Sequence, residues 1–223
     1  MLLLKGQSIL FIEHVYKQQS VTNNGERTSD SGMATIADRL LQMVYPELSL
    51  QVEACASGIH TLDSAVDGWL DAARRLRPDW LVIPPLHGDN WPAYSTDGRP
   101  LTPDLLEAAL RRMMRDIQPY AINLALVAPI SLTSSDKGFI SPYADVARSV
   151  AEEEGCLFID AQAEIDDVRL KYAHQAAPTN EELSADIEMS LTNVFLQAIG
   201  FQWVRRNAFA VTERPSFQLS CSC

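Results

Sequence analysis

Short apolar segments alternate five times with patterns typical of amphipathic helices in this 223-residue chain. Such alternation favours a parallel sheet, because parallel strands need crossover connections and these are usually helices. Helices then cover both faces of the sheet, so each strand is an apolar run. We therefore predict an α/β fold, a three-layer sandwich with a five-stranded, mostly parallel sheet and helices on both faces. The predicted strands are 8–12, 50–54, 80–83, 122–127 and 156–159.

Start and stop signals accompany the helical patterns. Thr61 is expected to cap one helix and Thr102 another, which Pro103 then begins, because a capping hydroxyl and a proline at the first position favour a helix start. The pair Ser141-Pro142 repeats this signal, and Gly155 is expected to end the helix that it starts. The predicted helices are 32–45, 61–76, 102–117, 141–154 and 183–199.

Two segments carry neither pattern. Residues 18–31 form a polar stretch of fourteen residues, and loops of this length are usually functional or mobile. Residues 201–223 hold three Arg and one Glu, so they are locally basic on an acidic chain. We therefore divide the chain into an α/β domain, 1–200, and a C-terminal extension, 201–223, which is a candidate partner-binding arm. Cys221 and Cys223 either form a metal, redox or covalent contact or belong to an incidental terminus.

Charge and composition argue against several classes of function. The chain has 18 Lys and Arg against 29 Asp and Glu, a formal net charge of −11. A nucleic-acid partner is not expected, since no basic excess is available to replace counterions. No apolar run is long enough to span a membrane, and the apolar start at 1–4 is too short for a secretion signal. We expect a cytoplasmic location, which is compatible with later incorporation into a larger particle, and we predict no cofactor.

Several stretches of the chain resemble blocks of one known family. An apolar strand at 9–12 precedes a polar loop, Ala-Ser-Gly follows the second strand at 56–58, and Arg-Pro-Asp precedes the third at 77–79. A helix–strand pair at 151–160 and a final helix at 183–200 follow in the same order. Together they resemble the SGNH (GDSL-type) hydrolase family over about residues 7–202. This resemblance implies ester or acyl hydrolysis by a serine nucleophile, an oxyanion hole and a histidine oriented by an aspartate.

The residues that carry this chemistry differ here. Glu13-His14-Val15 stands where the family has Gly-Asp-Ser, and Val15 has no hydroxyl that could attack a carbonyl. Asp186 matches the family's aspartate, but Met189 stands at the position of the general base and cannot accept a proton at neutral pH. The resemblance therefore implies a divergent member that lacks the nucleophile serine and the base histidine, with Gly58 retained in the oxyanion block.

Polar residues still follow the predicted strands at the carboxyl edge of the sheet, where ligands bind in such folds. Asp186 and Glu188 are expected near this edge, and His14 or His87 is a candidate base in a rebuilt site. No His or Cys pair there has metal-ligand spacing, so no metal is predicted. The candidate ligand-binding residues are Glu13, His14, Ser57, Gly58, His87, Asp89 and Asn90.

Three hypotheses for function remain open. The first is a catalytically degenerate domain that serves as a binding or structural subunit of a larger assembly, such as a viral particle, with protein partners contacted by the extension and an oligomer compatible with it. The second is an ester or acyl hydrolase with a rearranged active site, whose nucleophile has moved to Ser20 or Ser57. The third is a small-ligand or metal-binding module that uses His14, His87 and Asp89.

Overall fold

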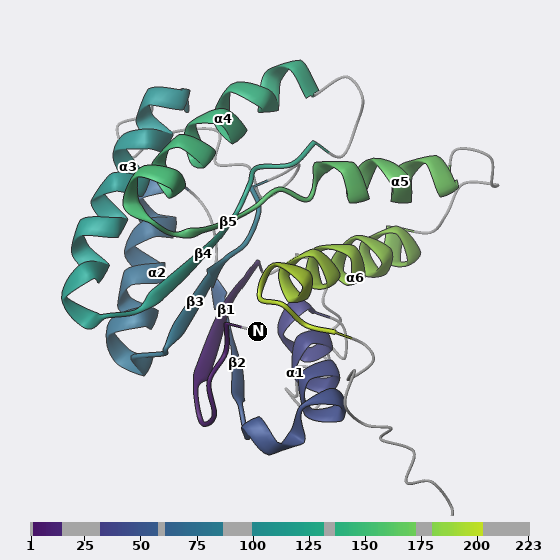
Figure 1. Ribbon diagram of the computed structural model, residues 1–223. Helices are drawn as coiled ribbons and strands as arrows, with labels where there is room; N and C mark the ends of the chain where they lie inside the picture. The colour runs from purple at the N-terminus through teal and green to yellow at the C-terminus, as the bar shows by residue number, and fades with distance from the viewer. Residues whose placement is uncertain are drawn as a thin grey trace, which may run out of the picture.

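One parallel sheet organises the molecule (Figure 1). The computed structural model describes residues 2–14, 32–57, 61–86, 100–131, 137–172 and 180–202, with the backbone alone at 14, 56, 57 and 180–184. Its five strands lie in the order β2-β1-β3-β4-β5, and every neighbouring pair is parallel. The predicted α/β sandwich is therefore confirmed. The strands are β1 (Ser8–His14), β2 (Gln51–Ser57), β3 (Trp80–Ile83), β4 (Asn123–Val127) and β5 (Leu157–Ile159).

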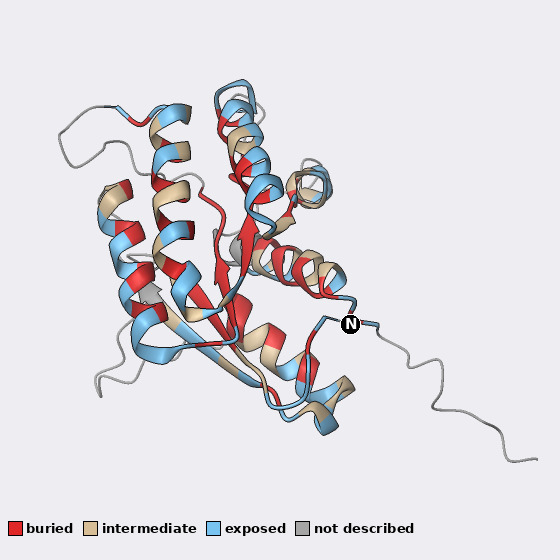
Figure 2. Ribbon diagram, turned by 60° about the vertical axis from the view of Figure 1, so that its left-hand side comes forward, coloured by how far each residue is buried: buried red, intermediate tan, exposed pale blue. Residues whose placement is uncertain are grey.

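Helices cover both faces of the sheet, as Figure 1 shows. Successive side chains of a strand point to opposite faces. Leu10 and Ile12 of β1 therefore lie in the core beneath α2, α3 and α4, whereas Ile9 and Phe11 lie in the core beneath α1, α5 and α6. Figure 2 shows this buried material on both sides of the strands. The helices are α1 (Met33–Val44), α2 (Leu62–Leu76), α3 (Pro103–Ile117), α4 (Lys137–Glu154), α5 (Gln162–Tyr172) and α6 (Asn180–Ala198), with short 3₁₀ helices at Pro46–Leu48 and Gln118–Tyr120.

Two predicted helix starts are confirmed. Thr61 and Ser64 form a capping box at α2, in which the Ser64 N–H donates to the Thr61 hydroxyl at 3.2 Å and the Thr61 N–H donates to the Ser64 hydroxyl at 3.1 Å. Thr102 accepts a hydrogen bond from the Leu105 N–H at 3.3 Å, and Pro103 is the first residue of α3. These contacts satisfy N–H groups that have no partner inside a helix.

The predicted start at Ser141-Pro142 is wrong, because α4 already begins at Lys137 and Pro142 lies inside it. Packing of the turn before the proline explains this extension. Ile140 is buried there, and Tyr143 is buried with its hydroxyl donating to the Leu101 carbonyl at 2.8 Å. These contacts hold a helical turn that proline would otherwise discourage.

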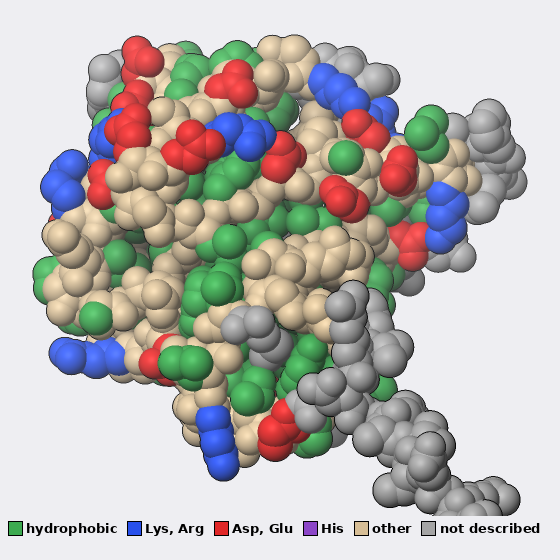
Figure 3. All heavy atoms as spheres, in the orientation of Figure 1, with side chains coloured by type: hydrophobic (Ala, Val, Ile, Leu, Met, Phe, Trp, Pro, Cys, Tyr) green, Lys and Arg blue, Asp and Glu red, His purple; other side chains and the backbone are tan. Residues whose placement is uncertain are grey.

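Helix α5 was not predicted from the sequence. Ile165 is the one fully buried residue of this helix, which therefore lacks the apolar stripe that identifies an amphipathic helix. Ion pairs join it to its neighbours, with Asp166 bound to Lys137 of α4 and Lys171 bound to Asp186 of α6. Figure 3 shows the corresponding mixture of acidic and basic side chains over α4 and α5.

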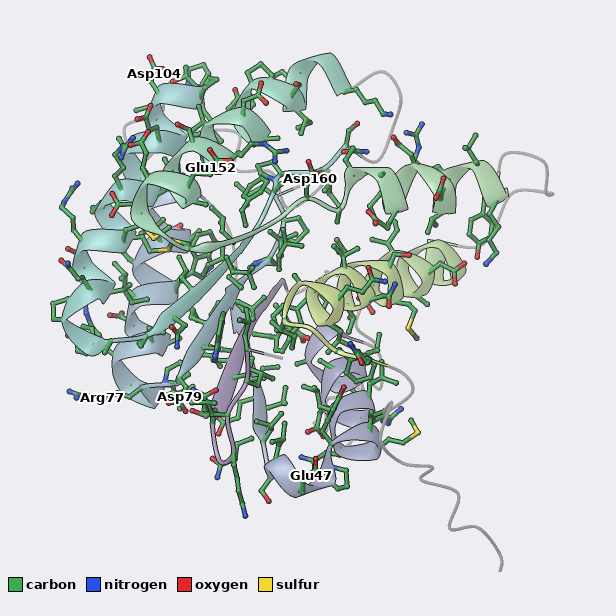
Figure 4. All side chains as sticks on the ribbon, viewed as in Figure 1. Glu47, Arg77, Asp79, Asp104, Glu152 and Asp160 are labelled. Carbon is green, nitrogen blue, oxygen red and sulfur yellow. The ribbon has the colours of Figure 1, made fainter. Side chains whose placement is uncertain are left out.

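Hydrogen bonds at the amino ends of the strands align three of them. Asp79, labelled in Figure 4, accepts from the Ser8 N–H at 2.7 Å and from the Ser8 hydroxyl at 3.1 Å. The Asp79 carbonyl accepts from the Asn123 backbone N–H and side-chain amide at 2.9 and 3.0 Å. These bonds tie β1 to the segments that begin β3 and β4. No helix within the described ranges is both long and apolar enough to cross a membrane.

Candidate functional site

The carboxyl ends of β1 and β2 bring predicted site residues together. Glu13 pairs in register with Ala56, and His14 pairs with Ser57. The backbones of Glu13, His14 and Ser57 therefore lie side by side at the edge where parallel α/β sheets bind ligands. Other predicted residues fall outside the part of the chain that the structure describes. These are Val15, Ser20, Gly58, His87, Asp89, Asn90, Cys221 and Cys223.

Glu13 is held against the N-terminus of α1. A carboxylate oxygen of this half-buried residue accepts a hydrogen bond from the Ala34 N–H at 3.0 Å. Gly32 precedes the helix and has no side chain to cap it, so Glu13 supplies an oxygen from the neighbouring strand. A Cβ atom at Gly32 would lie only 2.8 Å from that oxygen, and glycine is therefore what makes the approach feasible. Burial raises the pKa of Glu13, while the Ala34 hydrogen bond opposes the rise.

Helix α6 places a second carboxyl group opposite Glu13. The ring of Phe195 packs edge-on against that of Phe11, with 5.1 Å between centroids. Phe11 and Glu13 share one face of β1, since they are two residues apart. Glu188 lies two turns before Phe195 on the same face of α6. Burial, and to a smaller degree the negative charge of Glu13, raise the pKa of Glu188 to about 7.

Asp186 and Met189, both on α6, lie in different environments. The Asp186 carboxylate accepts a hydrogen bond from the Tyr172 hydroxyl at 2.8 Å and pairs with the Lys171 ammonium, both at the end of α5. These two partners lower the pKa of Asp186. The Met189 side chain is 48% exposed. The residue that the resemblance matched to the orienting aspartate is thus bound to α5.

Gln162 joins the chain segments that follow β4 and β5. The Gln162 amide accepts from the Ser131 N–H at 2.7 Å and donates to the Ser131 carbonyl at 3.1 Å. This two-point contact joins the segment after β4 to the first residue of α5. Ser131 is buried, so this contact lies inside the protein. Within the described ranges, no group of three or more His, Cys, Asp and Glu side chains could hold a metal ion.

The pairing of Glu13 with Glu188 was not predicted, although both were expected near this edge. The strand period links Glu13 to Phe11, and the helix period links Glu188 to Phe195. The periodicity of the sequence does not predict the contact between β1 and α6, which joins the two ends of the domain. Gly32 offered a further signal, because a glycine directly before a helix often marks a close approach of another group.

Comparisons with known proteins identify similar chains. No protein-family model matches this sequence. An acetylxylan esterase from Geobacillus stearothermophilus is 27% identical over 218 residues, which cover 90% of this chain and 97% of that protein. The crystal structure of Axe2, an acetylxylan esterase from the same organism, matches with a TM-score of 0.67 and 26% identity, covering 92% of this chain and 100% of the other. LAE5, an α/β hydrolase enzyme from the metagenome of Lake Arreo in Spain, shares the fold, with a TM-score of 0.65 and 22% identity over 90% of this chain and 98% of the other.

Three further solved structures of Axe2 are of catalytic mutants, in which a serine, an aspartate or a histidine is replaced by alanine. The aspartate and the histidine are three positions apart in that enzyme, as Asp186 and Met189 are in this chain. Among the hypotheses above, the comparisons favour an ester hydrolase over a structural subunit. The chain has an esterase-like hydrolase fold and is similar, over nine-tenths of its length, to an acetylxylan esterase.

Proposed function

We propose that this chain hydrolyses acetyl esters of carbohydrates with a rearranged active site at the carboxyl edge of its sheet. The observation that carries the proposal is the similarity to an acetylxylan esterase across 90% of this chain and 97% of that protein. The fold supports it, since Axe2 is covered completely by the match. Such a reaction needs a polar site with a group whose pKa lies near neutral pH, and this edge holds a carboxyl group of that kind.

The rearrangement concerns the nucleophile. Val15 cannot attack an ester carbonyl, so the attacking oxygen must come from another serine or from water. Ser57 ends β2 at the candidate site, and Ser20 lies in the polar segment after β1. Either serine, or a water molecule activated by a nearby base, would satisfy the same overall reaction.

A second candidate function is a non-catalytic subunit that binds a protein partner through the C-terminal extension. The replacement of a nucleophile by Val15 and of a base by Met189 favours it, because removing such groups normally costs orders of magnitude in rate. The extension, with its local excess of Arg, would supply the contact to an acidic partner surface. This candidate and the hydrolase differ in one measurable property, which is turnover of an ester.

Acetate release from acetylated xylo-oligosaccharides and hydrolysis of p-nitrophenyl acetate test the proposal directly. We expect turnover above that of a heat-denatured sample. Intact-mass analysis after treatment with a fluorophosphonate probe then separates the nucleophiles: one adduct that disappears in Ser57→Ala or Ser20→Ala identifies a serine, and turnover with no adduct indicates water. Ser149→Ala, on the exposed face of α4, is the matched control. A folded protein that releases no acetate would overturn the proposal and favour the binding subunit.

A further inference from the structure

We infer that Glu188 is the general base of the proposed ester hydrolysis and that Glu13 is the positioning residue that keeps it in this role. The inference rests on the proposed function and deepens it, because it assigns the proton transfer to a pair of residues outside the serine–histidine–aspartate pattern. It requires that both carboxyl groups be fixed in place, lie near one another and remain accessible from the carboxyl edge of the sheet.

Glu13 is fixed by a hydrogen bond from the start of α1. Its carboxylate accepts from the Ala34 N–H at 3.0 Å, and the absence of a side chain at Gly32 lets the first turn of α1 approach it closely. A carboxylate at a helix N-terminus is stabilised by the exposed N–H groups and by the helix dipole. Glu13 is therefore held in one place, and the Ala34 hydrogen bond opposes the rise in its pKa that burial causes.

Glu188 is fixed by the packing of α6. Phe195, two turns further along, is fully buried against Phe11 of β1. The buried Thr192 hydroxyl donates to the Glu188 carbonyl at 2.7 Å within the same helix. The Glu188 side chain itself is only half-buried, so a substrate or water can reach it.

The two carboxyl groups act on one another through their charges. Like charges in a partly buried site do not ionise independently, so the second proton is released at higher pH than usual. Burial, and to a smaller degree the charge of Glu13, raise the pKa of the Glu188 carboxyl to about 7, a value suited to taking up and returning a proton near neutral pH. The neighbouring elements α1 and α5 also carry charged side chains. These are Asp38, Arg39, Glu164, Asp166, Asp167, Arg169 and Lys171.

The reaction balances with water as the nucleophile. The ionised Glu188 carboxylate takes a proton from water as the water oxygen bonds to the ester carbonyl carbon and the carbonyl electrons move to its oxygen. The tetrahedral intermediate then collapses, the bond from carbon to the sugar oxygen breaks, and the proton on Glu188 passes to that oxygen. The products are acetic acid and the free sugar hydroxyl, and Glu188 is again ionised. Glu13 takes no part in the proton transfer, and its negative charge adds to the proton affinity of its neighbour.

Three glutamine variants of the full chain test this assignment by their pH–rate profiles with p-nitrophenyl acetate. Glu188→Gln is expected to lower kcat by about 100-fold or more and to remove the acidic limb near pH 7. Glu13→Gln keeps an oxygen that can accept from Ala34 but loses the negative charge, so its acidic limb is expected to move to lower pH. Glu152→Gln, on α4 across the sheet (Figure 4), is the control and is expected to leave the profile unchanged.

The outcomes separate this inference from the proposed function. If the unaltered protein does not hydrolyse the ester, the proposed function fails and the role of Glu188 fails with it. If the unaltered protein is active and Glu188→Gln keeps both its kcat and its acidic limb, only the inference is overturned. If the acidic limb of the Glu13→Gln profile stays at the pH seen for the unaltered protein, and circular dichroism shows that the variant is folded, the role of Glu13 is overturned.

Discussion

Gly32 is the residue that most directly constrains the position of Glu13. In Gly32→Ala the new Cβ would lie 2.8 Å from one Glu13 carboxylate oxygen and 3.1 Å from the other. The carboxylate must then leave the Ala34 N–H, and the start of α1 loses its cap. We expect the free energy of unfolding, measured by urea denaturation, to fall by about 1 kcal/mol.

Gly138→Ala is the matched control for this substitution. A Cβ at Gly138 would meet no atom within 4 Å, and the residue lies in the first turn of α4, where alanine is favoured over glycine by up to about 1 kcal/mol. The two variants should therefore change the unfolding free energy in opposite directions. Equal effects would contradict the close approach of Glu13 to Gly32.

Glu188 should also make stability depend on pH. The native state holds a proton on Glu188 up to a pKa of about 7, whereas the ordinary pKa of a glutamate in an unfolded chain is 4.5. Between these values the native state binds more protons than the unfolded state, so the unfolding free energy falls as pH rises. Urea denaturation of the unaltered protein and of Glu188→Gln at pH 5, 6, 7 and 8 would measure this contribution. We expect the decline to be smaller in the variant, and parallel curves would contradict it.

At this scale the sequence identifies the polar residues but not their contacts. Glu13 and Glu188 were both expected near the carboxyl edge, because they follow or accompany elements that end there. Asp186 was matched to an orienting aspartate, yet its partners are Lys171 and Tyr172 of a helix that lacks an amphipathic pattern. Side-chain partners depend on how helices pack, and periodicity within one helix does not report this.

Among the elements, local signals were reliable where they agreed with packing. Thr61 and Thr102 cap helices as expected because their side chains satisfy N–H groups within the same turn. The helix start predicted at Pro142 was wrong because the buried Ile140 and Tyr143, on either side of it, hold a helical turn there. Helix α5 was not predicted, because the ion pairs that hold it to its neighbours leave no apolar period in the sequence.

Ala121 marks a strained connection between α3 and β4. Its backbone has φ of 54°, a left-handed conformation that is unfavourable for residues with a Cβ, and the side chain is exposed. Ala121→Gly removes this strain at some cost in unfolded-state entropy. We therefore expect the free energy of unfolding, measured by urea denaturation, to rise by about 0.5–1 kcal/mol. Ala108→Gly, at an exposed position of α3, should instead cost about 1 kcal/mol. A loss of stability in both variants would contradict strain at Ala121.

For the whole molecule, the order of elements was enough to predict the sheet and the edge that holds the candidate site. Five apolar runs separated by crossovers leave few topologies, since such connections are almost always right-handed. The strand order places β1 at the centre of the sheet, between β2 and β3. This central position is what allows β1 to meet α6 from the far end of the chain, a contact that no local pattern predicts.

The end of the α/β domain can be located by comparing two changes. Phe201 is 7% exposed, its ring lies 5.6 Å from that of Tyr45, and its N–H donates to the Leu196 carbonyl at 2.8 Å. Gln202 donates its N–H to the Tyr45 hydroxyl at 3.0 Å. Phe201→Ala should therefore lower the unfolding free energy by about 3 kcal/mol, since it removes a large buried side chain.

Deletion of residues 203–223 addresses the extension without disturbing those contacts. We expect the shortened chain to keep the unfolding free energy of the full chain, because Phe201 and Gln202 remain to close the core beside Tyr45. The same deletion should lower the mass measured by light scattering if the extension joins copies of the chain, and should leave ester hydrolysis unchanged if the site lies at the sheet edge. A shortened chain that is as unstable as Phe201→Ala would show that the folded body extends past Gln202, and the division between domain and arm would then have to move toward the C-terminus.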